Sequence, residues 1–288
     1  MNRVLDLARN HPRPTLQLVR ARRGLRTWPT ITTAIDDPDT LARFAADGPL
    51  PVGYGVGMAE RVIEYPWLFS RRPAGTILDA GSCLNHKRIL ARLLPHATSI
   101  HIVTLAPERH SFPDLGVSYV YADLRDLPYR DATFDVVACI STLEHVGMDN
   151  SRYGGSAEDA QDHRAASARA LAELLRVTRP GGRVFVTVPY GRPDDLGWMR
   201  VFDRDDVESI TSVALEHGPL AAEPCVTVFR YDARGWKLSN FDDALGAVYR
   251  QTTTDPYPAD LAVTARSVAC VELRLQAAKP CGGPRESS

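Results

Sequence analysis

The chain has 288 residues, of which 44% are hydrophobic and 24% are charged, and its formal net charge is −1. This is the composition of a globular protein with room for a sizeable core, and it excludes wholesale disorder, collagen and coiled coil. No apolar run approaches the roughly 18–20 residues that span a bilayer, and the balanced charge gives no global attraction to nucleic acid or anionic lipid, so we expect a soluble cytoplasmic protein with no membrane partner.

The chain begins with a basic arm, residues 1–26, which carries seven arginines against the single acid Asp6. It is either an arm for an anionic partner or, as we favour, a solvated extension or a helix on the body. Residues 27–52 are rich in Pro, Thr and Asp and predict a connector or short helices. Residues 1–52 are therefore interpreted as an N-terminal extension, and residues 279–288, rich in Pro and Gly, as a disordered tail.

Between these ends, short β-branched runs alternate with longer helical stretches, which is typical of a mostly parallel sheet covered by helices. The pattern predicts one three-layer domain over residues 53–278. Five strands are predicted first, at 76–78, 99–104, 118–121, 134–140 and 183–188, and a final pair at 225–231 and 267–275. Helices are predicted at 84–94, 164–178 and near 205–214.

Five cysteines occur, and no two have CxxC spacing. An odd number without that spacing argues against a disulfide framework and against a zinc site, so we expect reduced thiols in the core. The five are Cys83, Cys139, Cys225, Cys270 and Cys281.

The end of the first predicted strand is the first place to look for a ligand, because ligands of open parallel sheets lie beyond the carboxyl ends of the strands. The small residues Ala80, Gly81 and Ser82 let the backbone approach a ligand closely, and a helix starting near Leu84 would direct N–H groups at negative charge. The segment has one glycine and then Cys83, so it lacks the GxGxxG of a dinucleotide-binding loop.

Four segments in this order resemble the class I S-adenosylmethionine (SAM)-dependent methyltransferases, over roughly residues 76–275. Residues 78–82, LDAGS, are similar to the family's first motif, and residues 121–128, YADLRDLP, to its adenine-binding loop. Residues 134–147, FDVVACISTLEHVG, are similar to its fourth strand and the motif that follows. Residues 175–182, LRVTRPGG, are similar to the helix end and turn before its fifth strand.

The resemblance implies a three-layer Rossmann-like α/β fold, with a mostly parallel seven-stranded sheet and an antiparallel last strand. It also implies SAM as cofactor, held at the methionine part by the backbone around Gly81. Asp123 would accept a hydrogen bond from the adenine amino group, and Leu124 would offer its N–H to the ring. The predicted cofactor-binding residues are Arg61, Asp79, Ala80, Gly81, Ser82, Asn85, Thr104, Leu105, Asp123, Leu124 and Ser141.

The sequence departs from the family at the second strand, which usually ends in an acid that binds the ribose hydroxyls. Here Thr104 stands at that end, and Glu108 would have to reach back. The first motif also lacks its later glycines, which leaves Asn85 or His86 to contact the cofactor carboxylate. Upstream, Arg61 is a candidate partner for that carboxylate, because a guanidinium matches it bidentately, or it pairs with Glu60 or Glu64.

Glu144 and His145 directly follow the fourth strand, beside the expected methyl group. One hypothesis makes His145 the general base and lets Glu144 orient it or the cofactor. In the other, Glu144 caps backbone N–H groups and His145 is a satisfied buried imidazole.

The polar loop 146–163 and the segment after the fifth strand predict the acceptor site, with Asp149, Arg152, Tyr153, Tyr190 and Trp198 as contacts and no metal. The preferred activity is SAM-dependent methylation, chiefly O-methylation, of a hydroxyl or an amine on a small molecule, sugar or glycan precursor. The alternatives are a catalytically silent binding protein and a nucleic-acid methyltransferase. The second is disfavoured because Ser141 to Glu144 replaces the D/N-P-P-aromatic segment of amino-group enzymes. The sequence leaves open whether the chain forms a homodimer.

Overall fold

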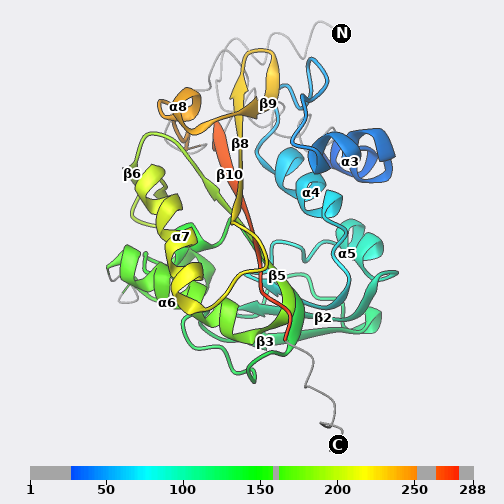
Figure 1. The fold of residues 1–288 in the computed structure, drawn as a ribbon, viewed down its shortest axis with the longest axis vertical. Helices are drawn as coiled ribbons and strands as arrows, with labels where there is room; N and C mark the ends of the chain where they lie inside the picture. Colours follow the sequence, from blue (N-terminus) through cyan, green and yellow to red (C-terminus); the bar gives the residue numbers. More distant parts are fainter. Residues whose placement is uncertain (1–26, 158–161, 252–263, 279–288) are drawn as a thin grey trace, which may run out of the picture.

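The computed structural model describes residues 27–157, 162–251 and 264–278. An eight-stranded mixed sheet forms the middle layer, in the order β3-β2-β1-β4-β5-β10-β8-β9. Helices cover both faces, with α3, α4 and α5 on one side and α6 and α7 on the other (Figure 1). The predicted three-layer α/β fold is therefore confirmed, while the predicted basic arm and tail lie outside the described residues.

The strands agree with the apolar runs of the sequence. β1, β2, β3, β4 and β5 pair in parallel, whereas β10 is antiparallel to both β5 and β8, so the last strand is antiparallel as expected. The predicted count of seven was one short, since β9 pairs with β8 at the edge of the sheet. The bounds are β1 Gly75–Ala80, β2 Ala97–Thr104, β3 Val117–Tyr121, β4 Phe134–Ile140, β5 Thr178–Pro189, β8 Cys225–Asp232, β9 Gly235–Ser239 and β10 Ser267–Arg274.

The central strands are apolar on both sides because both faces of the sheet are covered. Val137 and Val186 pack in a cluster with α6 and α7, while Val136 and Phe185, their chain neighbours, pack with α4 and α5. The helices are α3 Pro38–Ala45, α4 Arg61–Ser70, α5 Lys87–Leu93, α6 His163–Val177, α7 Arg204–His217 and α8 Phe241–Ala244. Short 3₁₀ turns are η1 Pro113–Leu115, η2 Leu143–His145 and η3 Ser151–Tyr153, and two short strands, β6 Asp194–Asp195 and β7 Arg200–Val201, pair separately.

The helix expected from Leu84 begins three residues later, at Lys87. The backbone N–H of Leu84 donates to Asp79 Oδ2 at 2.8 Å, and the Leu84 side chain is fully buried. These contacts hold residues 81–86 in an irregular turn, so the predicted helix start was wrong and the loop after β1 is longer than expected.

Residues 27–45, which precede the predicted domain, contribute side chains to its apolar core. Residues 27–36 are helical, and Ile31 and Ile35 join Phe44 of α3 in the apolar cluster around α4. The short helices allowed for residues 27–52 are therefore present and cover the sheet. Among the described helices, none has both the length and the apolar character that crossing a membrane requires.

Candidate functional site

A cavity of about 220 Å³ opens at the carboxyl ends of β1, β2 and β4. This is the edge where ligands of such sheets bind. The residues on its wall are Arg61, Gly81, Cys83, Val103, Thr104, Leu105, Glu108, Ala122, Asp123, Leu124, Arg125, Ser141, Thr142, His145, Val146, Gly147, Asn150 and Tyr153.

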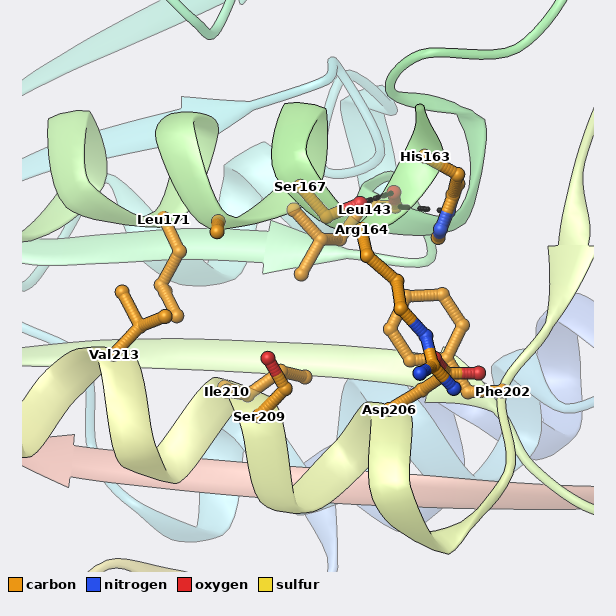
Figure 2. Close-up of a pocket in the computed structure, with 11 residues that line it drawn as sticks. Leu143, His163, Arg164, Ser167, Leu171, Phe202, Asp206, Ser209, Ile210 and Val213 are labelled. Atoms are coloured by element: carbon orange, nitrogen blue, oxygen red, sulfur yellow. Dashed lines mark hydrogen bonds and ion pairs between the residues drawn. The ribbon is translucent and has the colours of Figure 1, made fainter. Parts of the chain in front are cut away.

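Two other hollows do not suit a cofactor. The gap between α6 and α7 shown in Figure 2 measures about 20 Å³, room for about one water, and Arg164 Nε donates across it to Asp206 Oδ1 at 2.7 Å. A larger hollow of about 450 Å³ lies at the opposite end of the sheet, beside Ala132 and Thr178, where β4 and β5 begin. The cavity at the carboxyl ends is therefore the candidate site.

The turn after β1 forms one wall. Gly81 has a φ of +110°, and a Cβ there would lie 2.1 Å from Thr142 Oγ1, so only glycine fits this close approach of two loops. Beneath the turn, Asp79 is fully buried, and its Oδ1 has no hydrogen-bond partner among the described residues. Burial raises the pKa of Asp79 to about 8, against the opposing effect of the Leu84 N–H. Asp79 and Ala80 thus support the turn from behind rather than line the cavity.

Arg61 reaches this wall from α4 and pairs with Glu64, one of the two partners that the sequence proposed. Glu64 is fully buried, and its Oε1 also accepts hydrogen bonds from Ser141 Oγ at 2.5 Å and Thr187 Oγ1 at 2.7 Å. Arg61 Nη2 lies 3.6 Å from Cys83 Sγ on the cavity side. Arg61 therefore stands on the wall with its position fixed by a buried carboxylate.

Asp123 and Leu124 lie on the far wall, after β3. Asp123 is already paired, since Arg125 donates from Nη2 to Oδ2 at 2.6 Å and from Nε to both carboxylate oxygens at 3.0 Å. Burial acts to raise the pKa of Asp123, but the hydrogen bonds and charge of Arg125 outweigh it and lower that pKa. The carboxylate predicted to meet adenine is thus ionised and held in one orientation.

Thr104 and Leu105, at the end of β2, line the cavity together with Glu108. The Glu108 carboxylate is held there by Asn85, whose Nδ2 lies 3.0 Å from Glu108 Oε2. Asn85 also donates to the His110 carbonyl at 2.9 Å and accepts from the Tyr119 hydroxyl at 2.9 Å. Its carboxamide is therefore occupied, and Asn85 lies behind the wall rather than on it.

His145 lies on the cavity wall in the turn η2. Its Nδ1 is 2.9 Å from the Trp198 carbonyl, which only accepts, so a neutral ring donates from Nδ1 and carries its lone pair on Nε2. Burial lowers the pKa of His145 to about 4, although the hydrogen bond to Trp198 opposes this. The imidazole is therefore neutral near pH 7.

Glu144, its neighbour, is buried, with Oε1 4.0 Å from His145 Nε2 and Oε2 without a hydrogen-bond partner in the described part of the chain. Burial raises the pKa of Glu144 well above its usual range. Burial therefore disfavours the charged form of Glu144 beside the imidazole.

Three of the five predicted acceptor contacts gather around His145. Its ring stacks on Trp198 with centroids 5.3 Å apart and meets Tyr153 edge-on at 5.0 Å, and the Arg152 guanidinium lies 4.7 Å from the Trp198 ring centroid.

The side chains of the other two do not join this aromatic group. Tyr190 is 1% exposed and donates from its hydroxyl to the Phe241 carbonyl at 3.1 Å, so it belongs to the core beside α8 and not to the cavity wall. Asp149 accepts from the Ser151 N–H at 2.9 Å in a local turn.

The structure thus brings eight of the predicted cofactor and catalytic residues to the lining of one cavity: Arg61, Gly81, Thr104, Leu105, Asp123, Leu124, Ser141 and His145. Sequence reasoning missed Cys83, Thr142, Asn150 and Arg125 as wall residues. The small-residue turn and the strand ends were visible in the sequence, whereas these four are placed by loop geometry that no periodicity reports.

Comparisons with known proteins identify a methyltransferase domain over most of the segments that line this cavity. Residues 80–186 match the family model described as a methyltransferase domain. The chain is 32% identical over 128 residues to a tRNA (carboxymethyluridine(34)-5-O)-methyltransferase of Arabidopsis thaliana, covering 44% of this chain and 27% of that protein. It is 32% identical over 120 residues to a demethylmenaquinone methyltransferase of Streptomyces avermitilis, covering 40% and 42%. The chain thus spans less than half the length of either relative.

Among solved structures, it is similar to a Burkholderia thailandensis 1,6-didemethyltoxoflavin-N1-methyltransferase with bound S-adenosylhomocysteine, at 16% identity, 72% coverage of each chain and a TM-score of 0.41. The family match covers the turn after β1, the adenine-side loop and β4 to β5, the segments on which the resemblance rested. Residues 80–186 therefore match a methyltransferase domain, in agreement with the resemblance to the class I SAM-dependent methyltransferases.

SAM, the cofactor of this family, suits the cavity by its chemistry. The molecule is a nucleoside that carries a carboxylate, an amino group and a sulfonium. The wall offers a fixed cation, Arg61, near the glycine turn. On the side of β2 and β3 it offers two carboxylates, Glu108 and Asp123, the second of which is paired with Arg125. The cradle at Gly81, which a Cβ would fill, gives the close backbone approach that the first motif requires. The residues present therefore fit the group.

Proposed function

We propose that this chain is a SAM-dependent methyltransferase that acts on a hydroxyl, or alternatively an amine, of a small molecule, sugar or glycan precursor. The observation that carries the proposal is the state of His145. This ring stands on the wall of the cofactor cavity, is neutral because burial lowers its pKa to about 4, and keeps its lone pair on Nε2. A hydroxyl loses its proton as it is methylated, and an unprotonated imidazole can accept that proton.

Each part of the cofactor has a counterpart on the wall. Arg61 binds the carboxylate, and the backbone around Gly81 holds the methionine part. Thr104 and Glu108 receive the ribose hydroxyls, and Asp123 with the Leu124 N–H receives adenine. Bound there, SAM supplies an electrophilic methyl group.

The protein's part in the chemistry is alignment and proton removal. Holding the acceptor in line supplies roughly 7–11 kcal/mol of the barrier reduction. His145 Nε2 takes the acceptor proton, and the Trp198 carbonyl holds the ring and stabilises the imidazolium that forms. Glu144 is buried next to the ring, and burial disfavours a negative charge there that would hold the proton on the ring before reaction.

The acceptor enters on the side of η2 and η3. Tyr153 and Trp198 offer flat aromatic surface next to His145, and the Arg152 guanidinium over Trp198 adds a positive charge at the rim. Such a combination suits a polar ligand with a flat or ring-shaped body, such as a sugar or an aromatic metabolite.

The test has two stages. Calorimetry with SAM and S-adenosylhomocysteine measures cofactor binding, and we expect both to bind. Cofactor-loaded protein is then offered separate pools of hydroxylated metabolites, amines, sugars and glycan precursors, tRNA and demethylated quinones, with mass detection of a gain of one methyl. Methyl gain in the pool of hydroxylated metabolites, of amines, or of sugars and glycan precursors supports the proposal. Gain only on tRNA or on a quinone carbon contradicts the acceptor class, and absence of cofactor binding makes the chain a silent scaffold.

A further inference from the structure

The Glu64 carboxylate lies buried behind the wall of the cofactor cavity, where three side chains contact it. It is fully buried, receives hydrogen bonds from the Ser141 and Thr187 hydroxyls on Oε1, and pairs with Arg61 through Oε2. A buried carboxylate is costly unless it is paired and hydrogen-bonded, and here both oxygens are used. Its contacts are therefore fixed rather than exchangeable with water.

These contacts join two parts of the chain that line the cavity, α4 and the turn after β4, to the neighbouring strand β5. Arg61 comes from α4, Ser141 follows the last residue of β4, and Thr187 lies in β5. Ser141 has a φ of +40°, a left-handed conformation that is strained for a residue with a side chain. Its N–H donates to the Thr187 carbonyl and to Thr187 Oγ1, both at 3.0 Å, while its hydroxyl donates to Glu64. Glu64 thus helps to hold Ser141 in the strained turn as well as Arg61.

We propose that Glu64 is a positioning residue for the amino-acid part of the cofactor: it holds Arg61 and Ser141 at fixed places on the wall, and acts on the ligand through them. Its geometry leaves Arg61 Nη2 on the cavity side, next to Cys83, to meet a carboxylate. This inference rests on the proposed function, because it assumes that the cavity binds SAM.

The substitution Glu64→Gln tests it. An amide has only one oxygen, so either its NH₂ faces the Arg61 guanidinium, donor against donor, or the two hydroxyls lose their acceptor. The probes are S-adenosylhomocysteine and 5′-methylthioadenosine, two thioether nucleosides of which only the first carries the amino-acid part. We expect calorimetry to show S-adenosylhomocysteine binding weakened by about tenfold or more, as for loss of one charged hydrogen bond. Binding of 5′-methylthioadenosine should stay within about threefold of wild type.

Glu272→Gln is the matched control. Glu272 is another buried carboxylate with arginine partners, Arg71 at 3.2 Å and Arg274 at 2.8 Å, on β10 away from the cavity. The Glu272→Gln variant should have a lower melting temperature, but the ratio of its affinities for S-adenosylhomocysteine and 5′-methylthioadenosine should be that of the wild type. Should Glu64→Gln not fold, Thr187→Val removes one donor to Glu64 and should change the ratio in the same direction by a smaller factor.

The outcomes separate the two proposals. Equal weakening of both nucleosides, or unchanged binding of S-adenosylhomocysteine by a folded variant, overturns the positioning role and leaves the proposed function standing. Failure of the wild-type protein to bind S-adenosylhomocysteine overturns both.

Discussion

The Nδ2 atom of Asn85 lies 3.0 Å from Glu108 Oε2, so a residue of the turn after β1 fixes the one acidic side chain that the loop after β2 places on the cavity wall. The second strand itself ends in Thr104, without the acid usual at this point in the family. The loop and Asn85 together bring a carboxylate back to the same edge of the cavity.

This relationship predicts that Glu108 is needed for ribose recognition. Replacing Glu108 by Gln should weaken binding of S-adenosylhomocysteine by roughly 10–100-fold, the usual loss for a charged hydrogen bond. An analogue without the 2′- and 3′-hydroxyls should bind both proteins alike in calorimetry, and the exposed Glu223→Gln should behave as wild type. Equal loss for the analogue would mean that Glu108 acts on the loop and not on the ribose.

Asn85 illustrates what the sequence could and could not settle. The strands and long helices were predictable because their apolar periodicity is local, and the turn with Gly81 and the acid Asp123 were visible at strand ends. The direction of the Asn85 side chain depends on Glu108, His110 and Tyr119, which lie 23 to 34 positions away in the chain. Tyr190 failed as an acceptor contact for a similar reason, because its partner Phe241 lies 51 positions on.

The state of His145 predicts the pH dependence of turnover. Burial lowers its pKa to about 4, so the ring is unprotonated at neutral pH and gains a proton only as the pH falls through about 4. The acid limb of kcat/KM should therefore lie well below 6.5, the ordinary value for histidine. A limb near 6.5 that persists in the His145→Gln variant would assign the proton to another group.

The same residue should control rate rather than cofactor affinity. His145→Gln should lower kcat by about 10²–10⁴, the range for removing a general base, while the dissociation constant of S-adenosylhomocysteine stays within about threefold. Single-turnover methyl transfer and calorimetry measure the two quantities. A rate loss below tenfold would support the alternative in which His145 is a satisfied buried imidazole.

Asp79 predicts how the stability of the ligand-free protein changes with pH. Burial raises its folded-state pKa from 3.8 to about 8, so the folded protein holds this proton more tightly than the unfolded chain. The free energy of unfolding should therefore fall as pH rises from about 4 through about 8. Asp79→Asn removes this titration, so its stability relative to wild type should increase across that window by on the order of a few kcal/mol.

Urea unfolding at several pH values measures the Asp79 effect, and the exposed Asp114→Asn is the control. A constant difference between Asp79→Asn and wild type from pH 4 to 8 would show that Asp79 is ionised when folded. The Leu84 N–H, which donates to Asp79 Oδ2, would then outweigh burial.

Alanine substitutions at Gly81 and at Gly116 separate the effect of backbone strain from the effect of close packing. Gly81 and Gly116 both have positive φ, +110° and +77°, so an alanine at either position carries strain of about 1–2 kcal/mol. A Cβ at Gly116 meets nothing within 4 Å, whereas one at Gly81 would lie 2.1 Å from Thr142 Oγ1 and 2.6 Å from Thr142 Cβ.

Gly81→Ala must therefore push apart the loops after β1 and β4, which carry Cys83 and His145. We expect it to lose detectable S-adenosylhomocysteine binding and to unfold at lower urea than Gly116→Ala, which should bind as wild type. If Gly81→Ala and Gly116→Ala bind the ligand equally well, the two loops are not held together by this contact, and the cavity does not depend on it.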